Sequence, residues 1–283
     1  AGCVSDPIIS VAIMPRPTVN ITGPDDICID GTTTLSPTTG GTWVSSDPAV
    51  ASVTNGGVVT GHTEGVATFT FTSSVGCVSI PTEAVTVNPK PITVINGASS
   101  ICVGSTTQLS PTTGGTWVSS DPAVATITNG GLVTGVTVGS ATFTFTNTTT
   151  GCSSDPSSPV TVTAGPTVSI TGPTDICIGA TSTLSPTTGG TWTSSNPAIA
   201  TVTNGGVVTG VTQGTVTFRF RLTATGCLSD PTAPITVNGR PTVSVSGSSE
   251  ICIGGTTQLS PSTGGTWVSS NDAIATVTNG GVV

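Results

Sequence analysis

The sequence predicts an all-β protein made of tandem β-sandwich domains arranged as a rod. Its four tryptophans, Trp43, Trp117, Trp192 and Trp267, recur at a spacing of about 75 residues, and each period is long enough for one small domain. Threonine, valine and isoleucine dominate short runs that alternate in polarity, and no window shows helical spacing. Short proline-containing linkers separate the periods, and such linkers are stiff.

The period divides the chain into five parts. Residues 1–15 end a preceding repeat, three complete repeats follow, and residues 240–283 begin a further one. We call the complete units repeat 1 (16–89), repeat 2 (90–164) and repeat 3 (165–239). Because the chain opens and closes inside a repeat, we expect it to be an excerpt of a longer protein. No apolar stretch is long enough to predict a membrane span in this segment.

Seven short strands are predicted in each repeat. In repeat 2 they cover residues 91–95, 106–110, 115–120, 123–128, 132–135, 140–146 and 159–163. Asn129-Gly130-Gly131 separates two of them and predicts a hairpin with a type I′ turn, because Asn and Gly tolerate positive φ.

Alternation within the strands predicts which side chains form the core. Phe143 and Phe145 lie two residues apart on one face of their strand, whereas the flanking threonines share the other face. Repeat 3 places Arg219 and Arg221 on the polar face. Core packing is the preferred interpretation of all four tryptophans, and an exposed platform for stacking sugars is the alternative.

Composition disfavours nucleic-acid binding and catalysis. Only 6% of residues are charged, the net charge is −8, and five basic residues cannot neutralise a run of phosphates. With one histidine and with acidic residues mostly in turns, we expect no enzyme activity, no catalytic or cofactor-binding residues and no cofactor. Calcium loops of the D-x-D-x-D-G type are absent, so no metal site is expected, although one calcium ion shared by loops of adjacent domains remains an alternative.

The run TWVSSDPAVATITNGGLVTGVTVGSATFTFT, residues 116–146, resembles the bacterial immunoglobulin-like (Ig-like) repeats of group 2. Their signature combines Trp-x-Ser-Ser, an Ala-Thr-Val strand, a Gly-x-Val turn and strand, and a Gly-Thr-Ala-x-Phe strand. The resemblance covers the three complete repeats and both fragments, and it implies an Ig-like sandwich fold. The added Ile-Cys-Ile-Gly and Gly-Cys segments resemble the long repeat adhesins and extracellular filaments of gliding and predatory bacteria.

Eight cysteines alternate between a short spacing of about 25 residues and a long spacing of about 50 residues, which implies regular pairing. The resemblance places the Ile-Cys-Ile strand beside the last strand of the sandwich and so implies bonds within each repeat. The implied pairs are Cys28 with Cys77, Cys102 with Cys152, and Cys177 with Cys227. A Cys77–Cys102 bond across a domain boundary is the rival, and Cys3 and Cys252 have no in-repeat partner in this chain. Disulfides at this density indicate an extracellular protein at the cell surface.

The function these observations predict is structural. We expect a repeat segment of an extracellular fibre or adhesin, whose tip outside this segment binds a surface or substratum, with copies of the chain packing laterally into a filament. The alternative is a carbohydrate-binding array. Each of three basic linker residues either pairs with an acidic group of a neighbouring domain or stays solvated: Arg16, Lys90 and Arg240. The segments before the last strand differ in sequence among the repeats, either because they recognise a partner or because exposed loops tolerate sequence change.

Overall fold

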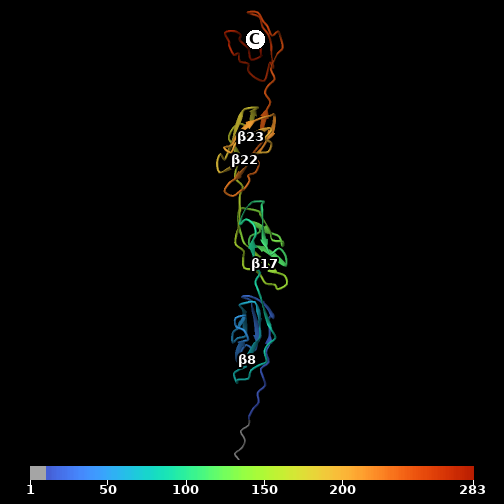
Figure 1. Cartoon of the computed structure of the whole chain (residues 1–283), viewed down its shortest axis with the longest axis vertical. Helices are drawn as coiled ribbons and strands as arrows, with labels where there is room; N and C mark the ends of the chain where they lie inside the picture. Colours follow the sequence, from blue (N-terminus) through green and yellow to red (C-terminus); the bar gives the residue numbers. More distant parts are fainter. Residues whose placement is uncertain (1–10) are drawn as a thin grey trace, which may run out of the picture. The chain divides into compact units, whose positions relative to one another are not determined.

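A computed structural model describes residues 11–283, so that Cys3 and most of the fragment 1–15 lie outside the described residues. The regular secondary structure of residues 11–283 consists of β-strands (Figure 1), in agreement with the predicted all-β class. Two compact units divide the chain, one ending at Gly165 and the other beginning at Pro166. The first contains repeats 1 and 2, and the second contains repeat 3 and residues 240–283.

Each complete repeat has nine short strands in the same order. Repeat 1 contains β1 (Asn20–Ile21), β2 (Asp26–Cys28), β3 (Thr32–Ser36), β4 (Gly41–Ser45), β5 (Ala51–Val53), β6 (Val58–Gly61), β7 (Gly65–Ala67), β8 (Phe69–Ser73) and β9 (Val85–Asn88). Repeat 2 contains β10 (Val94–Ile95), β11 (Ser100–Cys102), β12 (Thr106–Ser110), β13 (Gly115–Ser119), β14 (Ala125–Ile127), β15 (Leu132–Gly135), β16 (Gly139–Ala141), β17 (Phe143–Asn147) and β18 (Val160–Thr163).

Repeat 3 continues the series with β19 (Ser169–Ile170), β20 (Asp175–Cys177), β21 (Thr181–Ser185), β22 (Gly190–Ser194), β23 (Ala200–Val202), β24 (Val207–Gly210), β25 (Gly214–Val216), β26 (Phe218–Leu222) and β27 (Ile235–Asn238). The last segment has only β28 (Ser244–Val245) and β29 (Leu259–Ser260).

Two sheets form the sandwich in every complete repeat. In repeat 1 the first sheet has the order β1-β3-β6-β5, and the second side contains β2-β9-β7 and the β4-β8 pair. β2 runs parallel to β9, and all other pairs in the repeat are antiparallel. Since only Thr68 separates the end of β7 from the start of β8, the two pieces act as one long strand interrupted at that residue.

The predicted strands of repeat 2 differ from the structure in three places. The predicted strand 91–95 is limited to β10, and the prediction for 140–146 covers two strands, β16 and β17. Sequence reasoning missed β11, which pairs with β18 at the far end of the repeat and therefore has no local signal. The Asn129–Gly131 turn has positive φ only at Gly131, at +78°, so the two-residue type I′ turn is wrong and a longer loop ending in a left-handed glycine replaces it.

Almost every strand contributes one or two buried apolar side chains to the core of each repeat. In repeat 2, Trp117 is 6% exposed and its ring centroid lies 5.2 Å from that of Phe145 on the paired strand. The indole Nε1 donates a hydrogen bond to the carbonyl oxygen of Pro111 at 3.0 Å. Trp43 and Trp192 repeat this arrangement, at 5% and 6% exposure, whereas Trp267 in the incomplete last repeat is half-buried. The three tryptophans of the complete repeats therefore offer no platform for sugars.

Buried hydroxyl groups cover the open edge of β17. The main-chain N–H groups of Phe143 and Phe145 donate to Ser157 Oγ and Ser154 Oγ, at 3.1 and 3.0 Å. In return, the N–H groups of Ser154 and Ser157 donate to the carbonyl oxygens of Phe145 and Phe143. Ser79 and Thr82 do the same in repeat 1, and Ser229 and Thr232 in repeat 3. Much of each variable segment is thus fixed to the sheet, and only its tip is free of these contacts.

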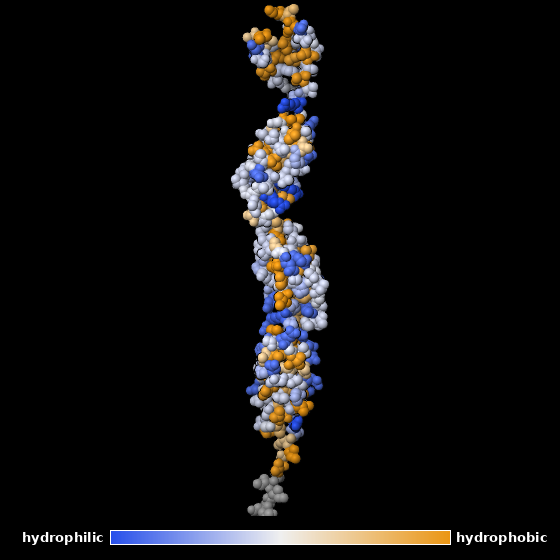
Figure 2. All heavy atoms as spheres, in the orientation of Figure 1, coloured by the Kyte–Doolittle hydropathy of each residue, from blue (hydrophilic) through white to orange (hydrophobic). Residues whose placement is uncertain are grey.

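Residues of intermediate hydropathy cover most of the visible surface, with scattered apolar and strongly polar side chains between them (Figure 2). Val44 and Val118 stand at equivalent positions on the outer face of β4 and β13, with exposures of 57% and 63%. Such isolated apolar residues are normal on a folded surface.

Candidate functional site

The contact region between repeats 1 and 2, which we call the joint, contains a disulfide and an ion bridge. Its first half is built by the parallel pairing of β2 with β9, which sets Cys28 opposite Asn88. Asn88 is the last residue of β9, and Pro89-Lys90-Pro91 then leads into repeat 2. Cys28 therefore lies at the end of repeat 1 from which the chain leaves.

Repeat 2 contributes Cys152 to the joint from the turn after β17. The N–H of Asn147 donates to the Cys152 carbonyl at 2.9 Å, which closes this turn. Cys152 forms a disulfide with Cys28, with a Cα–Cα distance of 5.6 Å and a sequence separation of 124. Cys152 is 0% exposed and its Sγ lies 4.0 Å from the Asn88 carbonyl oxygen of repeat 1, whereas Cys28 is partly exposed.

This bond corrects the pairing within repeats implied by the resemblance. Cys28 bonds to Cys152 in the following repeat, and Cys77 and Cys177 are free thiols, so none of the three predicted pairs forms. The rival Cys77–Cys102 bond is also wrong, because Cys77 is free.

Strand register explains the error. Cys28 is level with Asn88 at one end of the sandwich, and β7 begins beside it, since Gly65 pairs with Val87. The chain then runs the full length of β7 and β8 to Ser73, and at about 3.3 Å per residue this carries it about 26 Å away. Cys77 follows at the opposite end of the repeat. The long spacing from the early to the late cysteine thus connects two ends of one domain, which the sequence pattern alone does not reveal.

The remaining cysteines occupy equivalent positions in the other repeats. Cys102 and Cys227 are also disulfide-bonded, whereas Cys252 is an exposed free thiol, as is Cys177. Cys28, Cys102, Cys177 and Cys252 share the early position of the repeat, and Cys77, Cys152 and Cys227 share the late one.

Digestion with a glutamate-specific protease is expected to distinguish the two pairings. The three glutamates, Glu64, Glu83 and Glu250, divide the chain so that Cys28, Cys77 and Cys152 fall in three different fragments. After denaturation without reductant and with free thiols blocked, we expect fragment 1–64 to stay linked to 84–250. Fragment 65–83 should be released with blocked Cys77. Linkage of fragment 1–64 to fragment 65–83 would instead support the Cys28–Cys77 bond within repeat 1.

An ion bridge accompanies the disulfide. Lys90 Nζ lies 2.8 Å from Asp30 Oδ2 of repeat 1 and 3.0 Å from Asp155 Oδ1 of repeat 2, and these are the two salt bridges among residues 11–283. Of the two interpretations of the linker charges, pairing therefore holds for Lys90. Exposed ion pairs stabilise weakly, and the carboxylates are 72% and 81% exposed, so the bridge orients the joint more than it strengthens it.

The bridge has a defined pH range. Hydrogen bonding and the positive charge of Lys90 lower the pKa of Asp30, so its contribution is complete above the ordinary carboxyl value of about 3.9 and disappears as the pH falls through the lowered value. Hydrogen bonds to Asp30 and Asp155 raise the pKa of Lys90. The lysine contribution is complete below about 10.4 and is lost as the pH rises through the raised value.

Asp30 occupies a position that glycine takes in the other repeats. Its φ is +66°, in the left-handed region, and the equivalent residues Gly104, Gly179 and Gly254 have φ between +78° and +85°. Aspartate tolerates this conformation better than most residues but less well than glycine. Repeat 1 thus accepts a strained backbone position that supplies a carboxylate to Lys90.

A separate polar groove lies on repeat 3. Arg219 and Arg221 alternate along β26, opposite Thr193 and Thr191 of β22, and line a shallow groove of about 360 Å³. Their guanidinium groups donate to main-chain carbonyls, at 3.4 Å to Ser229 and 2.9 Å to Gly226, and neither forms a salt bridge within residues 11–283.

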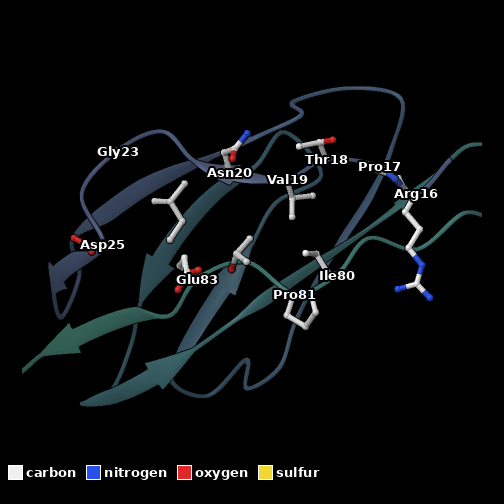
Figure 3. A pocket seen from close by; sticks show the side chains of 12 residues that line it. Arg16, Pro17, Thr18, Val19, Asn20, Gly23, Asp25, Ile80, Pro81 and Glu83 are labelled. Carbon is white, nitrogen blue, oxygen red and sulfur yellow. The ribbon is translucent and has the colours of Figure 1, made fainter.

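Repeat 1 carries a larger open groove of about 710 Å³ along β1. Figure 3 shows Arg16 at one end of it and Asp25 at the other, with Ile80, Pro81 and Glu83 on the facing segment. Its lining contains no serine, cysteine or histidine that could act as a nucleophile or proton shuttle. Across residues 11–283 no helix is long and apolar enough to cross a membrane.

Solved structures similar to this chain include an S-layer protein, invasin and intimin. The S-layer protein rSbsC(31-844) is 16% identical, with 87% of this chain and 43% of that chain covered and a TM-score of 0.25. Invasin, a bacterial integrin-binding protein, is 17% identical, with 81% and 60% covered and a TM-score of 0.33. The C-terminal fragment of intimin is 15% identical, with 64% and 60% covered and a TM-score of 0.27. The chain thus spans less than two thirds of each of these proteins.

No curated protein sequence matches the chain. The family model of the bacterial Ig-like domain (group 2) matches residues 10–78, 81–155 and 178–220, which is more than half of the sequence. With nine-stranded sandwiches repeated three times and the Trp-x-Ser-Ser segment in every repeat, the chain belongs to the bacterial Ig-like domain family (group 2).

Proposed function

We propose that this chain is a structural segment of a long extracellular fibre or adhesin, in which linked repeats hold a distal tip away from the cell surface. The tip, outside this segment, would bind the surface or substratum. The observation that carries the proposal is the covalent joint between repeats 1 and 2. A binding module needs no covalent bond to its neighbour, whereas a spacer gains from one because it limits rotation about the linker.

The composition supports lateral association of several chains into a filament. Residues 11–283 hold two salt bridges, and only 6% of the chain is charged, so neighbouring chains would repel one another weakly. Neutral threonine-rich sheet faces, such as those around Val44 and Val118, are suited to close packing.

Electron microscopy of the native assembly, sheared gently from cells that produce it, tests the proposal. Thick fibres with a regular axial repeat would support a structural subunit with lateral contacts, and thin single strands would support a spacer without them. Detached globular particles without an extended connection to the cell would overturn both. Sedimentation of the purified chain over a range of concentrations tests self-association separately, because a monomer at every concentration would exclude the filament.

The groove of Arg219 and Arg221 favours a second candidate function, the binding of acidic carbohydrate. Two guanidinium groups without a carboxylate partner among the described residues suit a uronate or sulfate group, and the threonine and serine hydroxyls beside them suit sugar hydroxyls. The tryptophans take no part in this candidate function, because those of the complete repeats are buried.

Replacing both arginines with threonine is expected to weaken binding to acidic glycans at low salt by about tenfold or more, since each lost charge-assisted hydrogen bond contributes about 1.5 kcal/mol or more. The equivalent residues of repeat 2 are Thr144 and Thr146, so R219T/R221T should fold normally. A glycan array without acidic ligands for the natural protein, or equal binding by the variant, would exclude this function.

A further inference from the structure

We propose that Cys177 of repeat 3 is a covalent attachment site, which forms a disulfide with the late cysteine of the Ig-like repeat that begins at Arg240. In this chain Cys177 is an exposed free thiol. The inference deepens the proposed structural function and rests on it, since a series of linked repeats needs a joint after repeat 3 as well.

The equivalent cysteines of the other repeats indicate the partner. Cys28 bonds to Cys152, the late cysteine of the repeat that follows. Cys102, which holds the same early position in repeat 2, is disulfide-bonded too. Repeats 1 and 2 are each followed by a complete repeat, whereas residues 240–283 contain an early cysteine, Cys252, and no late one. This difference accounts for the free thiol of Cys177.

Repeat 3 presents Cys177 in the same backbone setting in which repeat 1 presents Cys28. β20 runs parallel to β27, which sets Cys177 opposite Asn238. Cys28 is set opposite Asn88 in the same way. The residue after each early cysteine donates its N–H to the carbonyl of that asparagine, at 3.1 Å in repeat 3 and 3.0 Å in repeat 1. The half of the joint that repeat 1 contributes thus has a counterpart in repeat 3.

The linkers that leave the two repeats also correspond. Arg240 lies two residues after β27, as Lys90 lies two residues after β9. Arg240 reaches Gly179, since a Cβ atom built on that glycine would lie 3.4 Å from a terminal guanidinium nitrogen. Gly179 is the equivalent of Asp30, the repeat 1 partner of Lys90. In both repeats the basic side chain of the linker therefore reaches the loop just after the early cysteine.

The segment after repeat 3 begins the same sandwich that supplies Cys152 in repeat 2. Residues 264–270 are identical to residues 114–120. β28 pairs with β29 as β10 pairs with β12, and Trp267 Nε1 donates to the Pro261 carbonyl at 3.0 Å, as its equivalent does in repeat 2. In all three complete repeats an N–H donates to the carbonyl of the late cysteine at 2.9 Å and closes its turn. A repeat of this sequence would hold its late cysteine in the same turn.

Formation of the bond is an oxidation, and a small disulfide such as oxidised glutathione supplies the oxidant. The Cys177 thiolate attacks one of its sulfur atoms, which forms a mixed disulfide and releases one glutathione thiol. The late cysteine then attacks the Cys177 sulfur and releases the second glutathione thiol. Two protein thiols thus become one disulfide while the oxidant becomes two thiols. The exposure of Cys177 leaves its sulfur open to both steps.

Alkylation of the native assembly tests the attachment site. Protein sheared from the cells is treated with iodoacetamide, then reduced and treated with an isotopically labelled form. Because a disulfide sulfur is no nucleophile, we expect Cys177 to carry only the second label, whereas in the purified 283-residue chain it should carry the first. The first label on Cys177 of the native assembly would overturn the proposal.

A lengthened chain tests the partner. Val283 is equivalent to Val133, so residues 134–164 of repeat 2 are appended after Val283 to complete the last repeat, and they include a copy of Cys152. With free thiols blocked, digestion at glutamates should leave the fragment that begins at residue 251 linked to fragment 84–250. The C177S version should release it, and so should a version with serine in place of the appended copy of Cys152.

Release of that fragment from the lengthened chain, or its linkage in the C177S version, would overturn the assigned pair. If the added strands fail to fold, the fluorescence of Trp267 stays as in the natural chain, and the labels on the native assembly decide instead. The two proposals can fail separately. Fibres in micrographs with the first label on Cys177 would leave the structural function without this bond, and a bonded Cys177 in detached globular particles would leave the bond without the fibre.

Discussion

Replacing both Cys28 and Cys152 with alanine is expected to lower the free energy of unfolding of repeats 1 and 2 by about 4–5 kcal/mol, because the bond closes a long loop in the unfolded chain. The two cysteines are 124 positions apart, and in the chain-entropy model a loop of about 100 residues loses about 4.7 kcal/mol of unfolded-state freedom. This loss is comparable with the whole stability of a small domain. Because the loop contains strands of both repeats, we expect the free energy of unfolding to fall in both repeats.

Hydrogen exchange followed by mass spectrometry in increasing urea measures this effect repeat by repeat. Peptides covering β4–β8 and β13–β17 should lose protection at lower urea in the variant, whereas peptides covering β22–β26 give an internal reference. C77S is the matched control, since it alters a thiol that makes no disulfide, and its effect should stay within about 0.5 kcal/mol. Unchanged protection in C28A/C152A would mean that the joint holds by packing alone.

Replacing Trp117 with alanine is expected to cost repeat 2 about 3–5 kcal/mol, the range for removing a large aromatic side chain from a core. The indole is 6% exposed, packs on Phe145, and donates a hydrogen bond to Pro111 O at 3.0 Å. Removing it leaves a cavity in a core that has few other large side chains, and it leaves the Pro111 carbonyl without its donor. Urea unfolding of repeat 2, followed by exchange in peptides from β13 to β17, measures the loss.

The adjacent residue supplies the control for this experiment. Val118 lies on the same strand with 63% of its surface exposed, so Val118→Ala should change stability by less than about 0.5 kcal/mol. If the two substitutions have similar effects, the alternation of inward and outward side chains in β13 does not determine the core.

Local patterns predicted the sheets well because each strand carries its own alternation. Phe143 and Phe145 are predicted as core from their spacing and are 0% and 1% exposed, and the strand predicted at 106–110 is β12. The joint could not be predicted in the same way. The pairing of Cys28 with Cys152 depends on which ends of two domains meet, and this is set by the parallel register of β2 with β9, two strands at opposite ends of the repeat's sequence.

The partners of Lys90 could not be predicted from local sequence either. The sequence shows that Lys90 lies in a linker. Whether its charge is solvated or paired depends on Asp30 and Asp155, which lie far from it along the chain and in opposite directions. One signal could have pointed to Asp30: it is the position at which repeat 1 departs from the glycine of the other repeats. Such a departure at a left-handed position indicates that the side chain is needed.

The buried serine and threonine hydroxyls that cover the edge of β17 and its equivalents bear on how such a chain folds correctly. Near-identical sandwiches joined by short linkers are present at very high local concentration, and an uncovered strand of one is a good partner for its neighbour. Ser154 and Ser157 occupy the hydrogen-bonding groups that an exchanged strand would need. Each repeat therefore completes its own edge as it folds, and newly made neighbours are protected from exchanging strands.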